Sequence, residues 1–233
     1  MNANLNPTIR TVIAACGIIC GVSGLEHGFF ETLQGNVAPA GQMISAIGPA
    51  QRFWPGGIET AFTIVPNFLV TGILAMLFSL AVIVWSAGFL QRRGAALVFL
   101  LLSVAQFMVG GGFAQIFLVI LAAAGATQIH GSLRWLRGLP AGLRRAFGTL
   151  WLPGLVVFGI SFAGAIWAAI FGYFPLVSDL YPLQGEALTA FLWGLADVML
   201  VTLPLAILAA LARDSLPGRG IKGERRSNSY PVA

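Results

Sequence analysis

Five long apolar stretches constrain this chain more than any other feature of its sequence. They cover residues of about 11–30, 63–90, 95–129, 149–174 and 188–212. A helix that crosses the hydrocarbon of a bilayer needs about 20 residues of this kind. Only 9% of the 233 residues are charged, against about 25% in soluble domains. Because so few charges cannot cover a soluble protein of this size, the sequence predicts an all-α, multi-pass integral membrane protein.

The third apolar stretch, 95–129, is too long for one crossing, since a helix rises only about 1.5 Å per residue. Gly110, Gly111 and Gly112 lie inside it. Three glycines in succession break a helix and permit a tight turn. The stretch therefore forms either one long kinked helix or a hairpin of two short spans, at about 95–109 and 113–129.

The distribution of basic residues favours the hairpin. Cytoplasmic loops of membrane proteins are enriched in Lys and Arg. Six spans with the N-terminus inside place every basic residue except Arg52 on the cytoplasmic side, whereas five spans move the arginines of 134–145 outside. We therefore predict a bundle of six transmembrane helices in residues 1–213, with both termini cytoplasmic. Residues 214–233 are expected to form a disordered, basic cytoplasmic tail.

The partners implied by this composition are lipids. The formal net charge of +5 is expected to gather in cytoplasmic loops, where it attracts anionic lipid headgroups rather than nucleic acid. Short loops and an uncleaved first span are typical of a prokaryotic plasma-membrane protein. The sequence has no nucleotide-binding motif, and its two histidines, His27 and His130, are expected at opposite sides of the membrane. That separation excludes a haem held by both of them.

The first span carries two chemically different stripes. At 100° per residue, the cysteines Cys16 and Cys20 share one narrow stripe with Ser23, His27 and Glu31. Glycines form the neighbouring stripe and allow another helix backbone to approach closely; they are Gly17, Gly21, Gly24 and Gly28. This stripe predicts a tight packing face, used within the chain, in a homo-oligomer or with a partner membrane subunit. The remaining acid of the span, Glu26, has an angle that places it among the lipid-facing residues, where it either reaches the lipid headgroups or is covered by another helix.

His27 and Glu31 are the strongest candidates for an ion-binding site. They lie one helical turn apart near the outer end of the span, and ionisable residues inside a membrane are candidates for function by default. Glu59 lies on the same side, in an outer segment (31–62) that is expected to contain a short interfacial helix at 41–48. One histidine with carboxylates suits a divalent cation, so His27, Glu31 and Glu59 form a candidate metal site.

Asp197 is a second candidate, near the middle of the last span. A carboxylate there costs about 2.5–3.5 kcal/mol on insertion scales. Pro204 removes a backbone hydrogen bond on the same helix face, and an acid beside a weakened turn is typical of a midplane ion or proton site. The alternative is a protonated, hydrogen-bonded aspartic acid with a structural role.

Three function classes remain open from the sequence. The favoured class is a small-solute or ion transporter, with an outer polar site and the midplane Asp197. The second is a non-catalytic accessory subunit that packs partner helices against the glycine stripe. The third is a membrane enzyme with an outer-face metal site, which is less favoured because the sequence has no HExxH, CxxC or Walker motif.

Overall fold

The computed structural model describes residues 5–47, 59–113, 115–180, 182–183 and 185–216. Most of this part is helical, and it contains four helices or helical segments long and apolar enough to cross a membrane. They are α1 (Pro7–Leu33), α2 (Phe68–Gly88), α6 (Trp151–Phe171) together with the preceding α5 (Ala141–Phe147) and η3 (Gly148–Leu150), and α8 (Glu186–Asp214). Two shorter apolar helices are α3 (Ala95–Met108) and α4 (Gln115–Ala126), which η1 (Thr127–His130) extends. The remaining elements are β1 (Met43–Ser45), β2 (Thr60–Phe62), η2 (Arg134–Gly138) and α7 (Val177–Leu180).

The distribution of side chains is that of a protein in a lipid bilayer. Large apolar side chains project from the outer faces of the helices; Leu97, Ile160 and Val201 are 60%, 68% and 66% exposed. Polar side chains such as Thr71 and Ser79 are fully buried between helices. A soluble domain shows the opposite arrangement, because water would hydrate the polar groups and expel the apolar ones. The membrane assignment from composition is thus confirmed by the helices and their exposed apolar faces.

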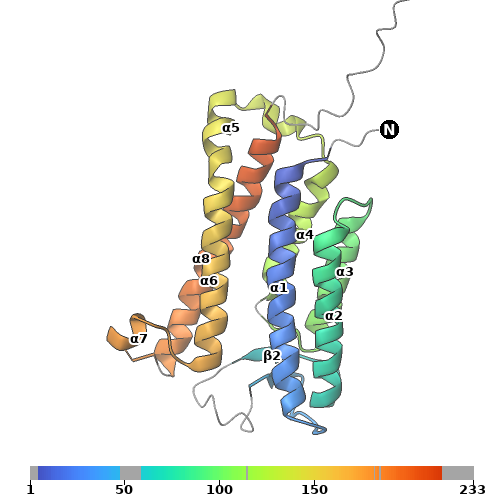
Figure 1. Cartoon of the computed structure of the whole chain (residues 1–233), viewed down its shortest axis with the longest axis vertical. Helices are drawn as coiled ribbons and strands as arrows, with labels where there is room; N and C mark the ends of the chain where they lie inside the picture. Colours follow the sequence, from blue (N-terminus) through green and yellow to red (C-terminus); the bar gives the residue numbers. More distant parts are fainter. Residues whose placement is uncertain (1–4, 48–58, 114, 181, 184, 217–233) are drawn as a thin grey trace, which may run out of the picture.

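α1 is the central helix of the bundle. It packs against α2 along most of its length and also contacts α4, α6 and α8, while α6 and α8 form a second close pair. Figure 1 shows the α6–α8 pair on one side of α1 and the α2–α3 pair on the other. The large apolar cluster lies between these helices in the half nearer the N-terminus; Ile13 and Phe99 are among its fully buried members.

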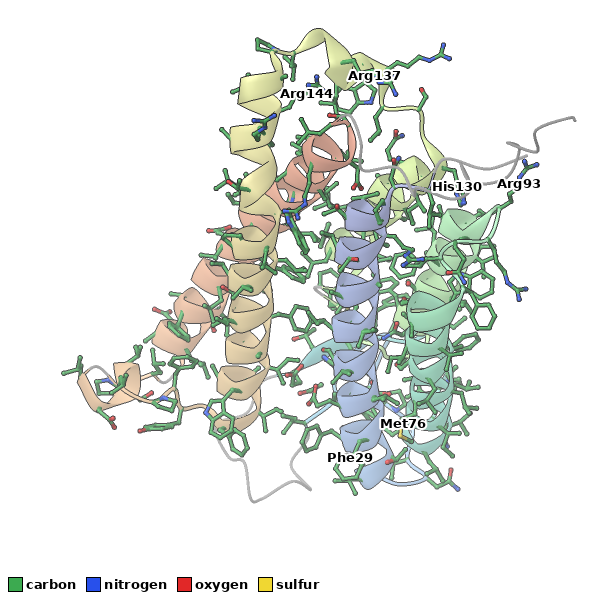
Figure 2. The ribbon with its side chains drawn as sticks, turned by 45° about the horizontal axis from the view of Figure 1, so that its top comes forward. Phe29, Met76, Arg93, His130, Arg137 and Arg144 are labelled. Atoms are coloured by element: carbon green, nitrogen blue, oxygen red, sulfur yellow. The ribbon has the colours of Figure 1, made fainter. Side chains whose placement is uncertain are left out.

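One end of the bundle carries the positive charge. Arg93, His130, Arg137 and Arg144 lie there, at the end opposite to Phe29 and Met76 (Figure 2). The same end holds the start of α1, because the Asp214 carboxylate at the end of α8 accepts hydrogen bonds from the backbone N–H groups of Thr8 and Ile9, at 3.1 and 2.9 Å. These N–H groups of the first turn have no partner within their own helix.

The first residues of the predicted C-terminal tail, Asp214 and Ser215, make defined contacts with the bundle. Asp214 is the last residue of α8, and the Arg144 guanidinium donates to the carbonyl and hydroxyl oxygens of Ser215 at 2.8 and 3.1 Å. The rest of the predicted tail, residues 217–233, lies outside the described residues.

The other end of the bundle is closed by backbone in extended conformation. β1 pairs with β2 in antiparallel register, so the expectation of an interfacial helix at 41–48 is wrong for the described residues up to 47. Alternate burial along Met43–Ser45 fits a strand with one face on the bundle. Met43–Ser45 forms a strand because the next element, Thr60–Phe62, satisfies its backbone groups.

The triple glycine lies against this small sheet. α3 ends at Met108 and α4 begins at Gln115, so the long apolar stretch is broken at the glycines, as predicted from their sequence. Gly110 N–H donates to the Phe62 carbonyl at 2.9 Å, and Phe113 N–H to the Thr60 carbonyl at 3.1 Å. Non-helical backbone at membrane depth is tolerated only where such hydrogen bonds satisfy it. Hydrogen bonds to the sheet therefore explain how α3 and α4 can both end at this turn, although each is shorter than a bilayer is thick.

Candidate functional site

The glycine stripe of α1 is used inside the chain. A Cβ atom added at Gly28 would lie 2.6 Å from the Gly72 carbonyl oxygen, and one added at Gly72 would lie 2.5 Å from the Gly28 carbonyl oxygen. Gly17 and Gly21 likewise contact α2, and Gly24 contacts the Gln106 amide of α3. The glycines bring α1 so close to α2 and α3 that the neighbouring polar stripe becomes fully enclosed by protein.

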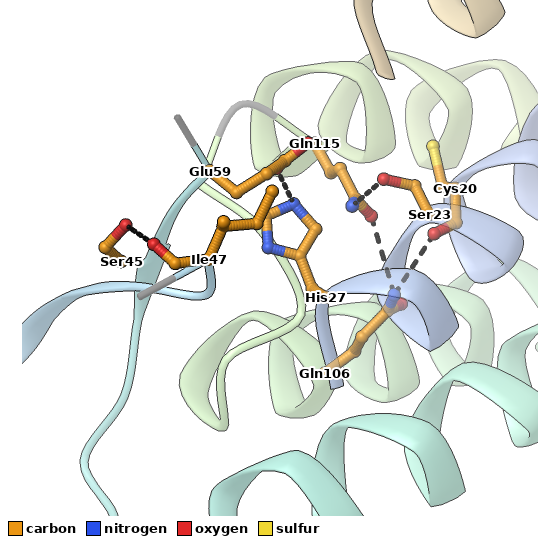
Figure 3. Close-up of polar contacts among 8 residues, drawn as sticks. All are labelled: Cys20, Ser23, His27, Ser45, Ile47, Glu59, Gln106 and Gln115. Carbon is orange, nitrogen blue, oxygen red and sulfur yellow. Dashed lines mark hydrogen bonds and ion pairs between the residues drawn. The ribbon is translucent and has the colours of Figure 1, made fainter. Parts of the chain in front are cut away.

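The core of the candidate site is a contact between α1 and the start of β2. His27 Nε2 lies 2.7 Å from Glu59 Oε2, and both side chains are more than nine-tenths buried (Figure 3). Glu59 is held there by the hairpin, because the Ala46 N–H donates to the Glu59 carbonyl at 2.7 Å. The structure thus places residues 27 and 59 together, which their sequence positions left open, and this contact depends on the β1–β2 pairing.

Glu26 joins this pair, which the sequence did not indicate. One ligand atom from each of Glu26, His27 and Glu59 lies within 4.8 Å of the other two, a spacing suited to a metal ion. Both carboxylate oxygens of Glu26 are buried, whereas its position on the helix had suggested that it faces lipid. The helical wheel misplaced it because the wheel does not include the hairpin that covers this side of α1. The available signal was the acid itself, since an unpaired carboxylate is rarely left facing hydrocarbon.

Glu31 lies one turn further along α1 and is not one of these three ligands. Its side chain is fully buried, and a Cβ atom at Gly110 would collide with both of its carboxylate oxygens. Gly110 also has φ 101° and Gly112 φ 96°, values that favour glycine. A Cβ at Gly112 would lie 2.9 Å from His27 Nε2. The glycine turn therefore forms one wall of the site, a role beyond the helix break that its sequence predicts.

Five buried polar atoms of this cluster have no hydrogen-bond partner among the described residues. They are both carboxylate oxygens of Glu26, both of Glu31, and Nδ1 of His27. Such groups are rare in native structures, because leaving them unpaired away from water is costly. Their concentration at one place indicates a site that accommodates a charged or polar ligand.

A separate line of hydrogen-bonded groups lies beside His27, next to α1 (Figure 3). Gln115 Nε2 donates to Ser23 Oγ at 2.7 Å, and Gln106 Nε2 lies 3.5 Å from Gln115 Oε1 and donates to the Cys20 carbonyl at 3.2 Å. In the sequence these two glutamines flank the glycine turn, and in the structure both amides donate to atoms of α1.

Asp197 is not part of this cluster. It is exposed on α8, and the described residues offer it no hydrogen-bond or ion-pair partner. Its neighbours Val198 and Val201 are also exposed. The carboxylate therefore lies on the outer face of the bundle and not between helices.

The chain has no match among known proteins: no family model, no curated protein and no solved structure is significantly similar to it.

Proposed function

We propose that this protein is a small ion transporter or permease whose recognition site is the cluster of Glu26, His27, Glu31 and Glu59. The observation that carries the proposal is the burial of His27, Glu31 and Glu59 inside an apolar helix bundle, next to the buried carboxylate oxygens of the half-buried Glu26. Three of these four residues are glutamates, and only His27 can become positive. A bilayer protein retains such groups where they bind or relay ions.

The burial of the cluster favours an ion over a larger substrate. His27, Glu31 and Glu59 are at most 7% exposed, so a lipid-like molecule has no access to them as they stand. An enzyme would need an open position beside the reacting groups. For the accessory-subunit alternative, the glycine stripe that was to bind partner helices is already occupied by α2 and α3.

The packing also supports alternating access from the two sides of a membrane. Polar side chains continue from the cluster along α1 as far as Gln106, whose amide donates to the Cys20 backbone carbonyl. Beyond them the core is filled by apolar side chains, including Ile9, Ile13, Phe99 and Ile129, which are all buried. A bundle with its polar site at one end and an apolar seal at the other corresponds to one of the two states that a transporter visits.

The proposed topology has six crossings, with α3 and α4 as short spans and both termini in the cytoplasm of a prokaryotic cell. The support is the concentration of arginine at the end of the bundle that holds the start of α1 and the end of α8. The ion-binding cluster then lies at the outer surface.

Cysteine labelling tests this topology. The native Cys16 and Cys20 are fully buried, so an impermeant maleimide reports on added cysteines. In intact cells we expect labelling of Leu180→Cys, which is 89% exposed in the native chain, and of Phe113→Cys, which is 39% exposed beside the glycine turn. The Arg137→Cys variant should be labelled only after permeabilisation. The reverse pattern would overturn the orientation.

Transport is tested with the purified chain in proteoliposomes. Uptake of Zn²⁺, Mn²⁺, Na⁺ and K⁺ is measured with internal indicators, and proton movement with a pH dye. We expect one cation to enter faster than into empty vesicles, and the Glu31→Gln variant to slow it by about 10- to 100-fold, the range seen when a group supporting an ion site is lost.

The control for that experiment is Glu186→Gln, which removes an exposed carboxylate from the start of α8 and should leave the flux unchanged. A wild-type protein that moves none of these ions would contradict the proposed function.

The Asp197→Asn variant tests the midplane site that the sequence suggests. Loss of flux would assign a second ion-binding site to the outer face of α8. Unchanged flux would restrict ion recognition to the cluster.

A further inference from the structure

We infer that Glu26, His27 and Glu59 bind one divalent transition-metal ion, with Glu31 as the neighbouring acid that adjusts the charge of the site. This inference names the class of ion, and its biological role rests on the proposed transport function. The site itself can be tested without any measurement of transport.

The donor atoms indicate the kind of metal. One imidazole nitrogen and carboxylate oxygens form the mixed set that suits Zn²⁺ and related first-row ions, whereas Mg²⁺ and Ca²⁺ prefer oxygen alone. The thiols of Cys16 and Cys20 lie further along α1, and neither belongs to the group of ligand atoms within 4.8 Å of one another. The assignment therefore predicts nitrogen and oxygen ligands and no sulfur.

The distances fit an ion that replaces a proton. His27 Nε2 and Glu59 Oε2 are 2.7 Å apart, which is a hydrogen bond with a proton between the two atoms. Two ligand atoms of a tetrahedral Zn²⁺ lie roughly 3.3–3.6 Å apart, given bonds of about 2.0–2.2 Å. A shift of less than about 1 Å in these side chains would exchange the proton for the metal.

The charge of the cluster fits a divalent cation. Metal ligands bind in their deprotonated forms, so the metal-bound site would hold a neutral His27 imidazole and up to three ionised glutamates, Glu26, Glu31 and Glu59. Buried charges persist only where they are paired. A divalent ion neutralises two of these charges, and one proton on Glu31 would neutralise the third.

The unpaired atoms provide independent support. The Glu26 oxygens are buried without a partner in the described chain, although they belong to the metal-sized group. The fully buried Glu31 carboxylate borders the same group, held between α1 and the glycine turn. A structural hydrogen-bond network would have satisfied these oxygens, whereas a metal site leaves them free for the ion and its water.

The first experiment measures metal binding to the full-length protein in detergent, by equilibrium dialysis against ZnCl₂ or MnCl₂ and by native mass spectrometry. We expect one ion per chain, with affinity reduced roughly 100-fold or more in both His27→Ala and Glu59→Gln, since each removes a direct ligand. The matched control is Glu186→Gln, an exposed acid outside the cluster, which should bind as the wild type does. Equal affinity in all four proteins would overturn the site.

A second experiment needs no variant and so does not depend on whether the variants fold. X-ray absorption of the Zn²⁺-loaded wild-type protein should show nitrogen and oxygen scatterers only. Sulfur at about 2.3 Å would assign the metal to the cysteines and overturn the inference.

The outcomes also separate this site from the proposed transport. Stoichiometric metal binding by a protein that moves no cation in vesicles would support the site and contradict the transport function. Cation flux through a protein that binds no stoichiometric metal would contradict the site and leave the transport function standing.

Discussion

Replacing Gly72 with leucine is expected to prevent α1 and α2 from packing and to remove most of the stability of the bundle. A Cβ atom at this position would lie 2.5 Å from the Gly28 carbonyl oxygen and 2.8 Å from the Thr32 backbone nitrogen. Neither backbone atom can rotate away as a side chain can. Extra methylenes in a packed core typically cost about 1–3 kcal/mol, and a leucine against backbone should exceed that range.

The measurement is unfolding of the purified protein in mixed micelles with increasing SDS, followed by circular dichroism and tryptophan fluorescence. The control is Gly194→Leu in α8, because a Cβ added at Gly194 meets no atom within 4 Å. It introduces the same side chain into a membrane helix without a collision and should unfold close to the wild type. Equal unfolding midpoints for Gly72→Leu and the wild type would show that the close approach of the two helices is not needed.

Removal of one member of the His27–Glu59 pair is expected to cost about 3–5 kcal/mol of unfolding free energy, because it leaves the other buried without its partner. The single variants are His27→Leu and Glu59→Leu. The double variant His27→Leu/Glu59→Leu removes both groups, so it should be more stable than the sum of the single effects predicts. We expect a coupling of about 1–3 kcal/mol, the upper part of the range for residues in direct contact.

The same SDS titration gives the four unfolding free energies of this double-mutant cycle. A parallel cycle of Glu59→Leu with Gly142→Ala supplies the control, since Gly142 lies in α5 and a Cβ there meets no atom within 4 Å. Additive effects are expected in that control. Additive effects in the His27–Glu59 cycle would mean that the 2.7 Å contact contributes nothing to the folded protein.

The positions of the apolar helices followed from local sequence. Each predicted span overlaps one apolar helix of the structure, and the predicted break at Gly110–Gly112 separates α3 from α4. These features depend on the length of an apolar run and on the freedom of glycine backbone, which neighbouring residues determine. The number of crossings and the side on which the termini lie depend on the membrane as well, and remain predictions.

The candidate site was predictable only in part. His27 and Glu31 could be placed on one face of α1 because helical periodicity relates them directly. The position of Glu59 could not be derived, since it lies 32 positions after His27 and the β1–β2 pairing sets its location. The same hairpin places Glu59 beside Glu26, whose angle on the helix had placed it among the lipid-facing residues.

The sequence by itself determined that this chain forms apolar helices in a bilayer, where the longest apolar run breaks, and that α1 has a polar stripe beside a glycine stripe. Only the tertiary structure decided what those stripes face: α2 against the glycines, and the glycine turn with Glu59 against the polar side chains. It also left Asp197 on the outer surface. Periodicity fixes directions around one helix, whereas the identity of the neighbour in each direction depends on contacts between segments far apart in the chain.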